Sequence, residues 1–155
     1  MKVRVLAVGT RMPGWVREAC DEYVRRLGAG LPVSLAEIEA GPRGSGTPQR
    51  AIEAEGKKLL AALRADDFVV VLDERGVQMT TRELASWLSE RMQAGRDLAF
   101  IVGGPDGLAS QVRDRSHLTW SLSRLTLPHA LARVVLAEQL YRAHAVLANH
   151  PYHRE

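Results

Sequence analysis

The residues best suited to chemistry gather at the carboxyl terminus of the chain. The last seven residues, NHPYHRE, include the phenol of Tyr152, the imidazole of His153 and the guanidinium of Arg154. An imidazole can accept a proton near neutral pH, and a guanidinium stabilises developing negative charge. A short polar terminus is also the part of a chain that most often frays. The composition therefore leaves two interpretations, a tail that contacts substrate and an unordered end.

GGPDG, at 103–107, is the second segment of interest, and it directly follows the apolar run 98–102. Its G-G-x-x-G spacing differs from the dinucleotide fingerprint G-x-G-x-x-G, and no Lys-Ser/Thr follows it as in a P-loop. Two consecutive glycines let a backbone or a ligand approach closely. The segment is either a tight strand-to-helix turn or the wall of a binding site.

The segment SLSRLTLPHALAR, at 121–133, alternates hydroxyl-bearing and apolar side chains ahead of a helix that starts with proline. Free main-chain groups in an apolar loop suit a neutral purine ring. A buried connection whose polar groups bond internally fits the same pattern. His129 and Arg133, which follow at i, i+4 spacing, share one face of the predicted helix.

Several other kinds of site have no support in the sequence. No spacing comparable to H-E-x-x-H predicts a metal site, and no G-x-S-x-G elbow indicates a serine nucleophile. Cys20, the sole cysteine, fits a small apolar filler of an amphipathic helix. Glu138 and Arg142, also at i, i+4, are more typical of an ion pair than of catalysis.

Strand and helix patterns alternate along the chain. Strands are predicted at 2–8, 33–38, 68–72, 98–102 and 118–122, and helices at 14–27, about 49–64, 80–94, briefly after 107, and 128–147. The runs 68–72 and 98–102 are apolar without alternation, as in strands covered on both faces. The pattern predicts one three-layer α/β domain over residues 1–155 with a mostly parallel sheet. Ligands of such sheets bind beyond the carboxyl ends of the strands, here the loops after Leu72, Val102 and Leu122.

Two helix features can be predicted more closely. In the helix at 14–27, the spacing of Trp15, Ala19, Tyr23 and Leu27, with Val16 and Val24 beside them, predicts one buried stripe. Thr80 and Glu83 have the T-x-x-E spacing of a capping box and predict a helix that starts there.

Composition narrows the class of protein. With 155 residues, 46% of them hydrophobic and 25% charged, the chain has the composition of a folded domain. Its net charge of +3 allows a polyanionic partner without requiring one. A single cysteine predicts a reducing, cytoplasmic compartment. No apolar run approaches the roughly 20 residues of a membrane helix, so no membrane association is expected.

Several stretches together resemble one known family, and the resemblance runs from Met1 to Glu155. They are MKVRVLAVGTRMPGWV, the LD of VVVLDERG, IVGGPDGL, SLSRLTLPHALARVVLAEQLYRA and NHPYHRE. The chain is similar to the bacterial methyltransferases that modify N3 of a pseudouridine in 23S ribosomal RNA, in the loop of rRNA helix 69, on assembled ribosomes. The resemblance implies the SPOUT fold, in which a carboxy-terminal trefoil knot breaks the general rule against threaded chains. It also implies S-adenosylmethionine as cofactor, a homodimer and no metal.

The resemblance also implies which residues serve the reaction. For cofactor binding they are Leu72, Gly103, Gly104, Leu122, Ser123, Arg124, Leu125, Thr126 and Leu127. For catalysis we expect His153 as base or orienting group, Arg154 for charge stabilisation or phosphate contact, and Tyr152 against the target base, with His129 as the second choice of base.

A dimer would serve both the apolar surface and the RNA contact. The helix at 128–147 is apolar on more than one side and needs cover all round, which the sheet and a second subunit could provide together. A two-fold dimer could then bring the tail of one subunit to the cofactor of the other. Arginines of both subunits would form a joint RNA-binding surface, namely Arg11, Arg25, Arg26, Arg133 and Arg142.

Two competing hypotheses belong to other classes. One is a non-catalytic ribosome-binding protein that keeps a vestigial cofactor pocket. The other is an unrelated nucleotide-binding α/β enzyme. Binding of S-adenosylmethionine at micromolar concentration would favour the methyltransferase over the ribosome-binding protein, and thermal-shift screening against nucleotides would separate the nucleotide-binding enzyme.

Overall fold

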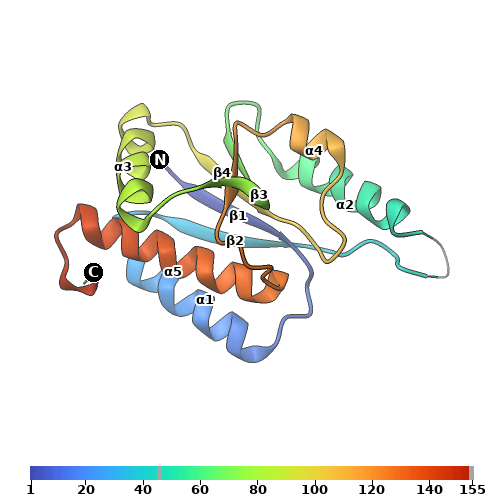
Figure 1. The fold of residues 1–155 in the computed structure, drawn as a ribbon, viewed down its shortest axis with the longest axis horizontal. Coiled ribbons are helices and arrows are strands. Elements are labelled where there is room, and N and C mark those ends of the chain that lie inside the picture. Colours follow the sequence, from blue (N-terminus) through green and yellow to red (C-terminus); the bar gives the residue numbers. More distant parts are fainter. Residues whose placement is uncertain (45–46, 154–155) are drawn as a thin grey trace.

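The computed structural model describes residues 1–44 and 47–153, except the side chain of His153. Within them, a single sheet lies between two layers of helices (Figure 1). Its strands are β1 (Val3–Val8), β2 (Val33–Ile38), β3 (Phe68–Gln78), β4 (Leu98–Val102) and β5 (Leu118–Ser121). The helices are α1 (Gly14–Leu27), α2 (Pro48–Ala62), α3 (Thr81–Ala94), α4 (Ser110–Asp114) and α5 (His129–Leu147), followed by the 3₁₀ turn η1 (Pro151–His153).

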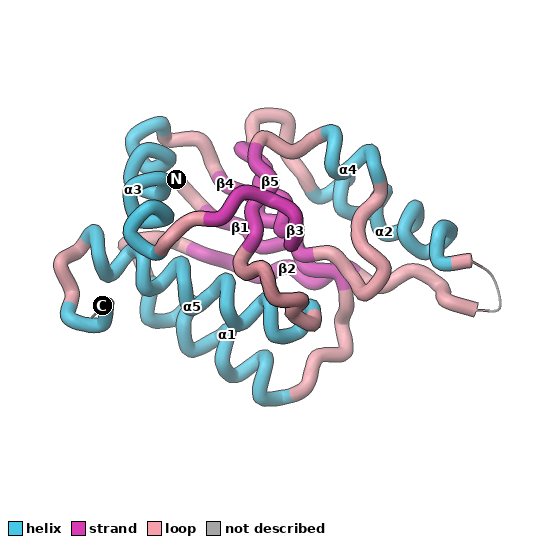
Figure 2. The backbone as a smooth tube through the Cα atoms, viewed as in Figure 1, coloured by secondary structure: helices cyan, strands magenta, loops and turns pink. Residues whose placement is uncertain are grey.

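The sheet is parallel throughout, in the order β2-β1-β4-β3-β5. Val5 of β1, for example, lies opposite Leu35 of β2 on one side and Phe100 of β4 on the other. Helices α1, α3 and α5 pack on one face and α2 and α4 on the other, with α1 and α5 side by side (Figure 2). The predicted three-layer parallel architecture is confirmed. The trefoil knot stays a prediction from the resemblance.

The central strands are covered on both faces, as their apolar runs predict. Every residue of β4 is buried. Phe100 points into the core beneath α1, α3 and α5, whereas Ile101 points into the core beneath α2 and α4. Successive side chains of a strand point to opposite faces, so a strand between two helical layers needs apolar residues at every position.

The predicted buried stripe of α1 is correct for Leu27 and for Val16 beside it, but wrong for Trp15. The buried side chains are Val16, Cys20 and Leu27, whereas the indole of Trp15 is 56% exposed. Neighbouring residues of a helix are about 100° apart, so a shift of one position turns a different face toward the core. Spacing at i, i+4 alone could not decide between these two adjacent stripes.

Strand β3 runs further than the apolar run at 68–72 predicts, because it is interrupted and then resumes. Trp120 of β5 pairs with both Leu72 and Val77 of β3, so the residues between them bulge out of the ladder. Gly76 in the bulge passes so close to β5 that an added Cβ would lie 2.6 Å from the Thr119 carbonyl oxygen. The bulge displays residues 73–76 at the carboxyl edge of the sheet.

Helix α3 begins with the predicted capping box. The Thr80 hydroxyl accepts a hydrogen bond from the Glu83 N–H at 3.1 Å, and the Glu83 carboxylate accepts one from the Thr80 N–H at 2.7 Å. Two N–H groups that the helix cannot bond internally are thereby satisfied.

We predict that Thr80→Ala lowers the free energy of unfolding by about 1 kcal/mol, because it removes the hydroxyl that caps the Glu83 N–H. Chemical denaturation monitored by circular dichroism measures this change. Ser86→Ala, at an exposed position in the interior of the same helix, is the matched control and should leave stability unchanged or slightly higher. Equal effects of the two substitutions would contradict the capping role.

Candidate functional site

A cavity of about 840 Å³ opens at the carboxyl edge of the sheet. Three chain segments form its walls: the bulge after Leu72, the turn after Val102, and the connection from β5 to α5. Of the predicted cofactor residues, the cavity is lined by Leu72, Gly103, Gly104, Leu122, Ser123, Leu125, Thr126 and Leu127. Arg124 does not line it. Segments from three separate parts of the sequence thus meet where the parallel strands end, as predicted.

The GGPDG turn is too crowded for side chains at its first two positions. A Cβ added to Gly103 would lie 3.0 Å from Cγ of Leu108, and one added to Gly104 would lie 3.1 Å from Cγ1 of Val8. Gly107 has φ +88°, a conformation that favours glycine, and donates its N–H to the Gly104 carbonyl at 3.2 Å. The sequence left a turn and a binding wall as alternatives, and the structure contains both in one segment.

An ion-pair network centred on the buried Glu55 carboxylate connects this turn to helix α2. The Glu55 carboxylate, 1% exposed, accepts hydrogen bonds from Nη1 of Arg43 at 2.6 Å and from the Gly41 N–H at 2.9 Å. Nε of Arg43 donates to Asp106 in the turn at 2.8 Å. Hydrogen bonds to both carboxylates raise the pKa of Arg43, so its charge is permanent. Arg43 therefore ties the turn to helix α2 and to the loop at residues 39–44.

The bulge of β3 carries charged residues that sequence analysis did not select. Asp73 pairs with Arg113 of α4 and with Arg75. Burial by itself would raise the pKa of Asp73, but hydrogen bonds from Arg113 and from both the backbone and the side chain of Arg75 outweigh it and hold that pKa well below its ordinary value. The sequence does contain a signal for these site residues, the run Asp73-Glu74-Arg75. Charged side chains that directly follow a doubly buried strand must lie where that strand leaves the sheet.

The β5–α5 connection is braced by its own hydroxyl groups. Ser121 donates its hydroxyl hydrogen to the Ser123 carbonyl at 2.8 Å, and the Ser123 hydroxyl accepts the Leu125 N–H at 2.9 Å. The Thr126 hydroxyl donates to Glu74 of the bulge at 2.9 Å, which links two walls of the cavity. The Leu125 side chain is 74% exposed, so an apolar group lies open to solvent at the cavity.

His129, at the start of α5, is the histidine that lines the cavity. Burial lowers its pKa, and the charges of Arg133 and Arg43 lower it further. The imidazole is therefore neutral at neutral pH and can accept a proton or a hydrogen bond. This is the chemistry that was expected of it as the second choice of base.

Arg133 does not have the exposed, RNA-contacting position that was expected. Its side chain is 1% exposed. The guanidinium bonds to the Glu37 carboxylate at 2.7 Å and to the carbonyls of Val8 and Gly9 at 2.9 and 2.7 Å. With every bond directed into the protein and almost no solvent access, this residue cannot meet a phosphate.

The tail lies far from the cavity within one protomer. Helix α5 separates them with 19 residues, which at roughly 1.5 Å per residue is about 28 Å (Figure 1). Arg154 and the side chain of His153 lie outside the described residues. Tyr152 packs edge-on against Tyr141, with ring centroids 4.5 Å apart, and its hydroxyl donates to Glu138 at 3.2 Å. Burial raises the pKa of the Tyr152 phenol, which stays protonated.

Arg142 belongs to the same cluster as Tyr152. Its Nη2 lies 2.6 Å from Glu138, and its Nη1 donates to the Tyr152 carbonyl at 3.5 Å. The predicted Glu138–Arg142 ion pair is thus present. Arg142 remains half-buried, so its RNA-contacting role stays a prediction.

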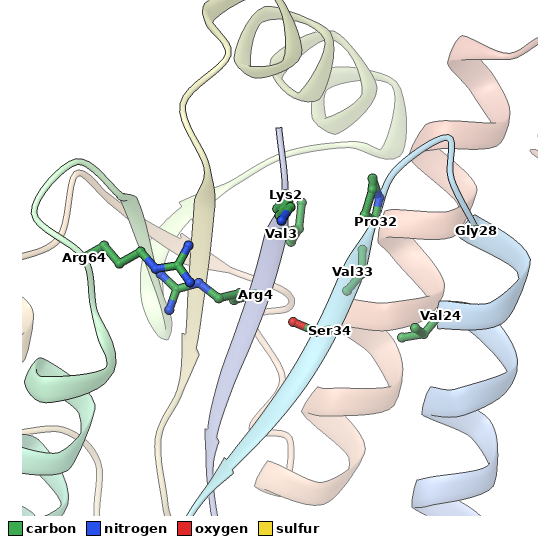
Figure 3. A pocket seen from close by; sticks show the side chains of 9 residues that line it. All are labelled: Lys2, Val3, Arg4, Val24, Gly28, Pro32, Val33, Ser34 and Arg64. Carbon is green, nitrogen blue, oxygen red and sulfur yellow. The ribbon is translucent and has the colours of Figure 1, made fainter.

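A second, smaller cavity of about 400 Å³ lies at the opposite, amino edge of the sheet (Figure 3). It is lined by Lys2, Arg4 and Arg64 among others. Arg4 pairs with Asp67, and Nη1 of Arg64 lies 3.8 Å from Asp97. Because carboxylates already engage both guanidinium groups, this cavity has less binding chemistry to offer than the one at the carboxyl edge.

Among the residues that the structure describes, no group of three or more His, Cys, Asp or Glu side chains could hold a metal ion. No helix of that part of the chain has the length and apolar character needed to cross a membrane.

Comparison with known proteins gives a consistent result. The sequence model of the family described as "Predicted SPOUT methyltransferase" matches residues 1–153. Two relatives named Ribosomal RNA large subunit methyltransferase H match the chain over almost its whole length. The one from Stenotrophomonas maltophilia (strain R551-3) is 51% identical over 155 residues, covering 99% of both chains. The one from Alkalilimnicola ehrlichii (strain ATCC BAA-1101 / DSM 17681 / MLHE-1) is 52% identical, also covering 99% of both chains.

A solved structure shares the fold at low sequence identity. It is the probable methyltransferase from Bordetella pertussis Tohama I, with a TM-score of 0.58, 19% identity, and coverage of 92% of this chain and 95% of that chain.

We predict that Glu55→Ala lowers the free energy of unfolding by about 3 kcal/mol, since it leaves the Arg43 charge and the Gly41 N–H without their buried partner. Urea denaturation measures the loss, and faster hydrogen exchange of the Gly107 amide would report loosening of the turn. Glu53→Ala, exposed on the same helix and hydrogen-bonded to Gln49, is the control and should change stability by less than about 0.5 kcal/mol. A loss no larger than that of the control would contradict a supporting role for Glu55.

Proposed function

The chain belongs to the SPOUT methyltransferase family, and on this basis we propose that it transfers a methyl group from S-adenosylmethionine to large-subunit ribosomal RNA. The observation that carries the proposal is the convergence of three sequence-distant segments, all within the family match, on one cavity. The two full-length relatives, at about half the residues identical, support ribosomal RNA as the substrate. N3 of a pseudouridine is the acceptor that we propose.

The cavity suits the cofactor in shape and in chemistry. The crowded Gly103-Gly104 turn presents bare backbone, so a ligand can approach it more closely than it could approach side chains. Leu72, Leu122 and Leu127 supply apolar walls, and the main-chain groups of residues 122–127 are suited to an adenine edge. When bound, S-adenosylmethionine supplies an electrophilic methyl group on a sulfonium.

The protein's own task is to present the acceptor nitrogen without its proton. N3 of a neutral pseudouridine carries a hydrogen, and the negative charge left by its removal spreads to the adjacent carbonyl oxygens. His129, neutral and in the cavity, can take that proton, and a cation beside the carbonyl oxygens would stabilise the charge. His153 and Arg154 of the tail remain the first candidates for these two tasks.

We infer that the tail reaches the cavity from a second copy of the chain. Within one protomer, η1 follows the end of α5 opposite to His129, so the part of the tail that the structure describes lies away from the cavity of its own protomer (Figure 1). Helix α5 keeps partly exposed apolar side chains, including Leu131, Val134, Val135 and Tyr141. A two-fold dimer that covers them would place the two α5 helices together and could exchange their ends between sites.

Contact with RNA would use the remaining arginines. Arg11, Arg25 and Arg26 are exposed, and a dimer doubles the net charge of +3. Affinity for ribosomal RNA should then fall as salt rises. Modification of ribosomal RNA takes place in the cytoplasm, which is where we propose that the protein works.

The cofactor site can be tested with one glycine. We predict that Gly103→Val weakens S-adenosylmethionine binding at least tenfold in calorimetry, because the new side chain would displace Leu108 or occupy the cavity. Gly14→Ala is the control, since a Cβ there meets nothing within 4 Å. Wild-type affinity in the Gly103 variant would remove this turn from the binding site.

The reaction and the shared site can be tested together. Mass spectrometry of large-subunit RNA from cells with and without the protein should show one additional methyl group on a pseudouridine in cells that have it. Deleting residues 152–155 should abolish methylation while cofactor affinity stays within about twofold. Unchanged turnover after the deletion would refute a role for the tail.

Mixing the tail-deleted chain with the Gly103→Val chain tells which subunit supplies the tail. If the tail acts on the other subunit, each mixed dimer has one cavity that combines an intact turn with an intact tail, and activity returns. If the tail acts within its own subunit, no mixed site is complete and the mixture stays inactive.

A further inference from the structure

The largest fully buried side chain of the described residues is a charged one, that of Arg133. A charge inside a protein must be paired, and even then an apolar side chain of similar size often serves stability equally well. The pairing is also incomplete, because the buried Nε of Arg133 has no hydrogen-bond partner among the described residues. Stability alone therefore gives no reason for an arginine at this position.

The guanidinium joins three elements at the carboxyl edge of the sheet. Arg133 lies one turn after His129 on α5, its Nη1 bonds to Glu37 of β2, and its Nη2 bonds to the carbonyls of Val8 and Gly9, where β1 ends. Its planar fork can hold a carboxylate and two carbonyls in fixed relative positions.

The backbone at the end of β1 packs directly against the Arg133 guanidinium. Gly9 has φ +115°, donates its N–H to the Ile38 carbonyl at 2.7 Å, and directs its own carbonyl to Arg133. A Cβ added to Gly9 would lie 3.2 Å from Nη2 of Arg133 and 4.0 Å from Nε2 of His129. The end of β1, the buried guanidinium and the imidazole thus lie against one another beside the cavity.

We propose that Arg133 is a positioning residue of the methyl transfer, which fastens the first turns of α5 to the ends of β1 and β2 and thereby fixes the place of His129 in the cavity. The proposal rests on the proposed function, because it assigns His129 a part in that reaction. Arg133 itself is sealed from the cavity and touches neither substrate nor cofactor.

The same arrangement keeps His129 neutral. Burial and two nearby cations, Arg133 and Arg43, lower its pKa. The other charged groups that line the cavity are Asp73, Glu74, Arg75, Asp106 and Arg113. Of the carboxylates among them, Asp73 and Asp106 are paired with arginines and Glu74 accepts a hydrogen bond from Thr126. Removing the Arg133 charge should therefore raise the pKa of His129 and move the acidic limb of the pH–rate profile to higher pH.

The test compares two carboxylate-paired arginines at opposite edges of the sheet, Arg133, which is buried, and Arg4, which is partly buried. Arg133→Met removes the proposed clamp. Arg4→Met is the matched control, because Arg4 likewise bonds to a carboxylate, that of the buried Asp67, and to a backbone carbonyl, that of Ala62, but at the amino edge. Both variants should lose thermal stability. We expect Arg133→Met to lower kcat at least tenfold at saturating cofactor and RNA, and Arg4→Met to keep kcat within twofold.

NMR titration of the His129 ring in the cofactor-free protein gives a reading that needs no activity. We expect its pKa to rise in Arg133→Met and to stay at the wild-type value in Arg4→Met. Arg133→Lys, which keeps the charge but loses the fork, should leave this pKa low and still lower kcat at least threefold. If Arg133→Met does not fold, the kcat of Arg133→Lys alone tests the proposal.

Three outcomes would overturn the proposal: a kcat for Arg133→Met or Arg133→Lys within twofold of wild type, equal losses of kcat in Arg133→Met and Arg4→Met, or an unmoved His129 pKa in Arg133→Met. Failure of the proposed function would look different. In that case the wild-type protein would not methylate ribosomal RNA, while the His129 titration would still report whether Arg133 fixes the surroundings of this ring.

Discussion

The parallel sheet is the constraint on which the rest of the structure depends. Because all five strands run in the same direction, every strand ends at the same edge, and each loop that leaves a strand begins there. Residues 72–76, 103–107 and 122–128 are far apart in the sequence and meet only for this reason. Strands β3 and β4 pair from Phe68 opposite Leu98 to Val71 opposite Ile101, which places the residues that follow both strands next to each other.

Most carboxylates at the carboxyl edge of the sheet are paired with arginines. Asp73 is held by arginines, Asp106 and Glu55 by Arg43, and Glu37 by Arg133. Because these groups are paired, they hold in place the backbone that a ligand must approach. Pairing also leaves few unpaired charges in the cavity. A cavity whose charged side chains are mostly paired and whose lining includes several leucines suits an adenine and a methionine moiety.

Helix α5 connects the two parts of the proposed site, the cavity and the carboxy-terminal tail, but holds them at its opposite ends. It begins at the cavity with His129 and ends at the cluster of Tyr141, Arg142 and Tyr152. The tail is anchored on its own protomer by this cluster, yet it lies a helix length from the cavity that it is proposed to serve. The proposed second copy would resolve the difference, and the partly exposed apolar side chains of α5 would give that copy a surface to cover.

The amino-acid pattern alone was enough to predict the layers, the parallel sheet, the cavity-lining loops and the capping box, because these follow from local features such as uninterrupted apolar runs, glycine pairs and T-x-x-E spacing. It could not determine which stripe of α1 is buried, since two adjacent stripes were both apolar. Nor could it show that Arg133 is internal, because an arginine looks the same in a sequence whether it faces water or a buried carboxylate. Those outcomes depended on how α1 and α5 pack on the sheet, and only the tertiary structure brings Gly9, Glu37 and Arg133 into one contact.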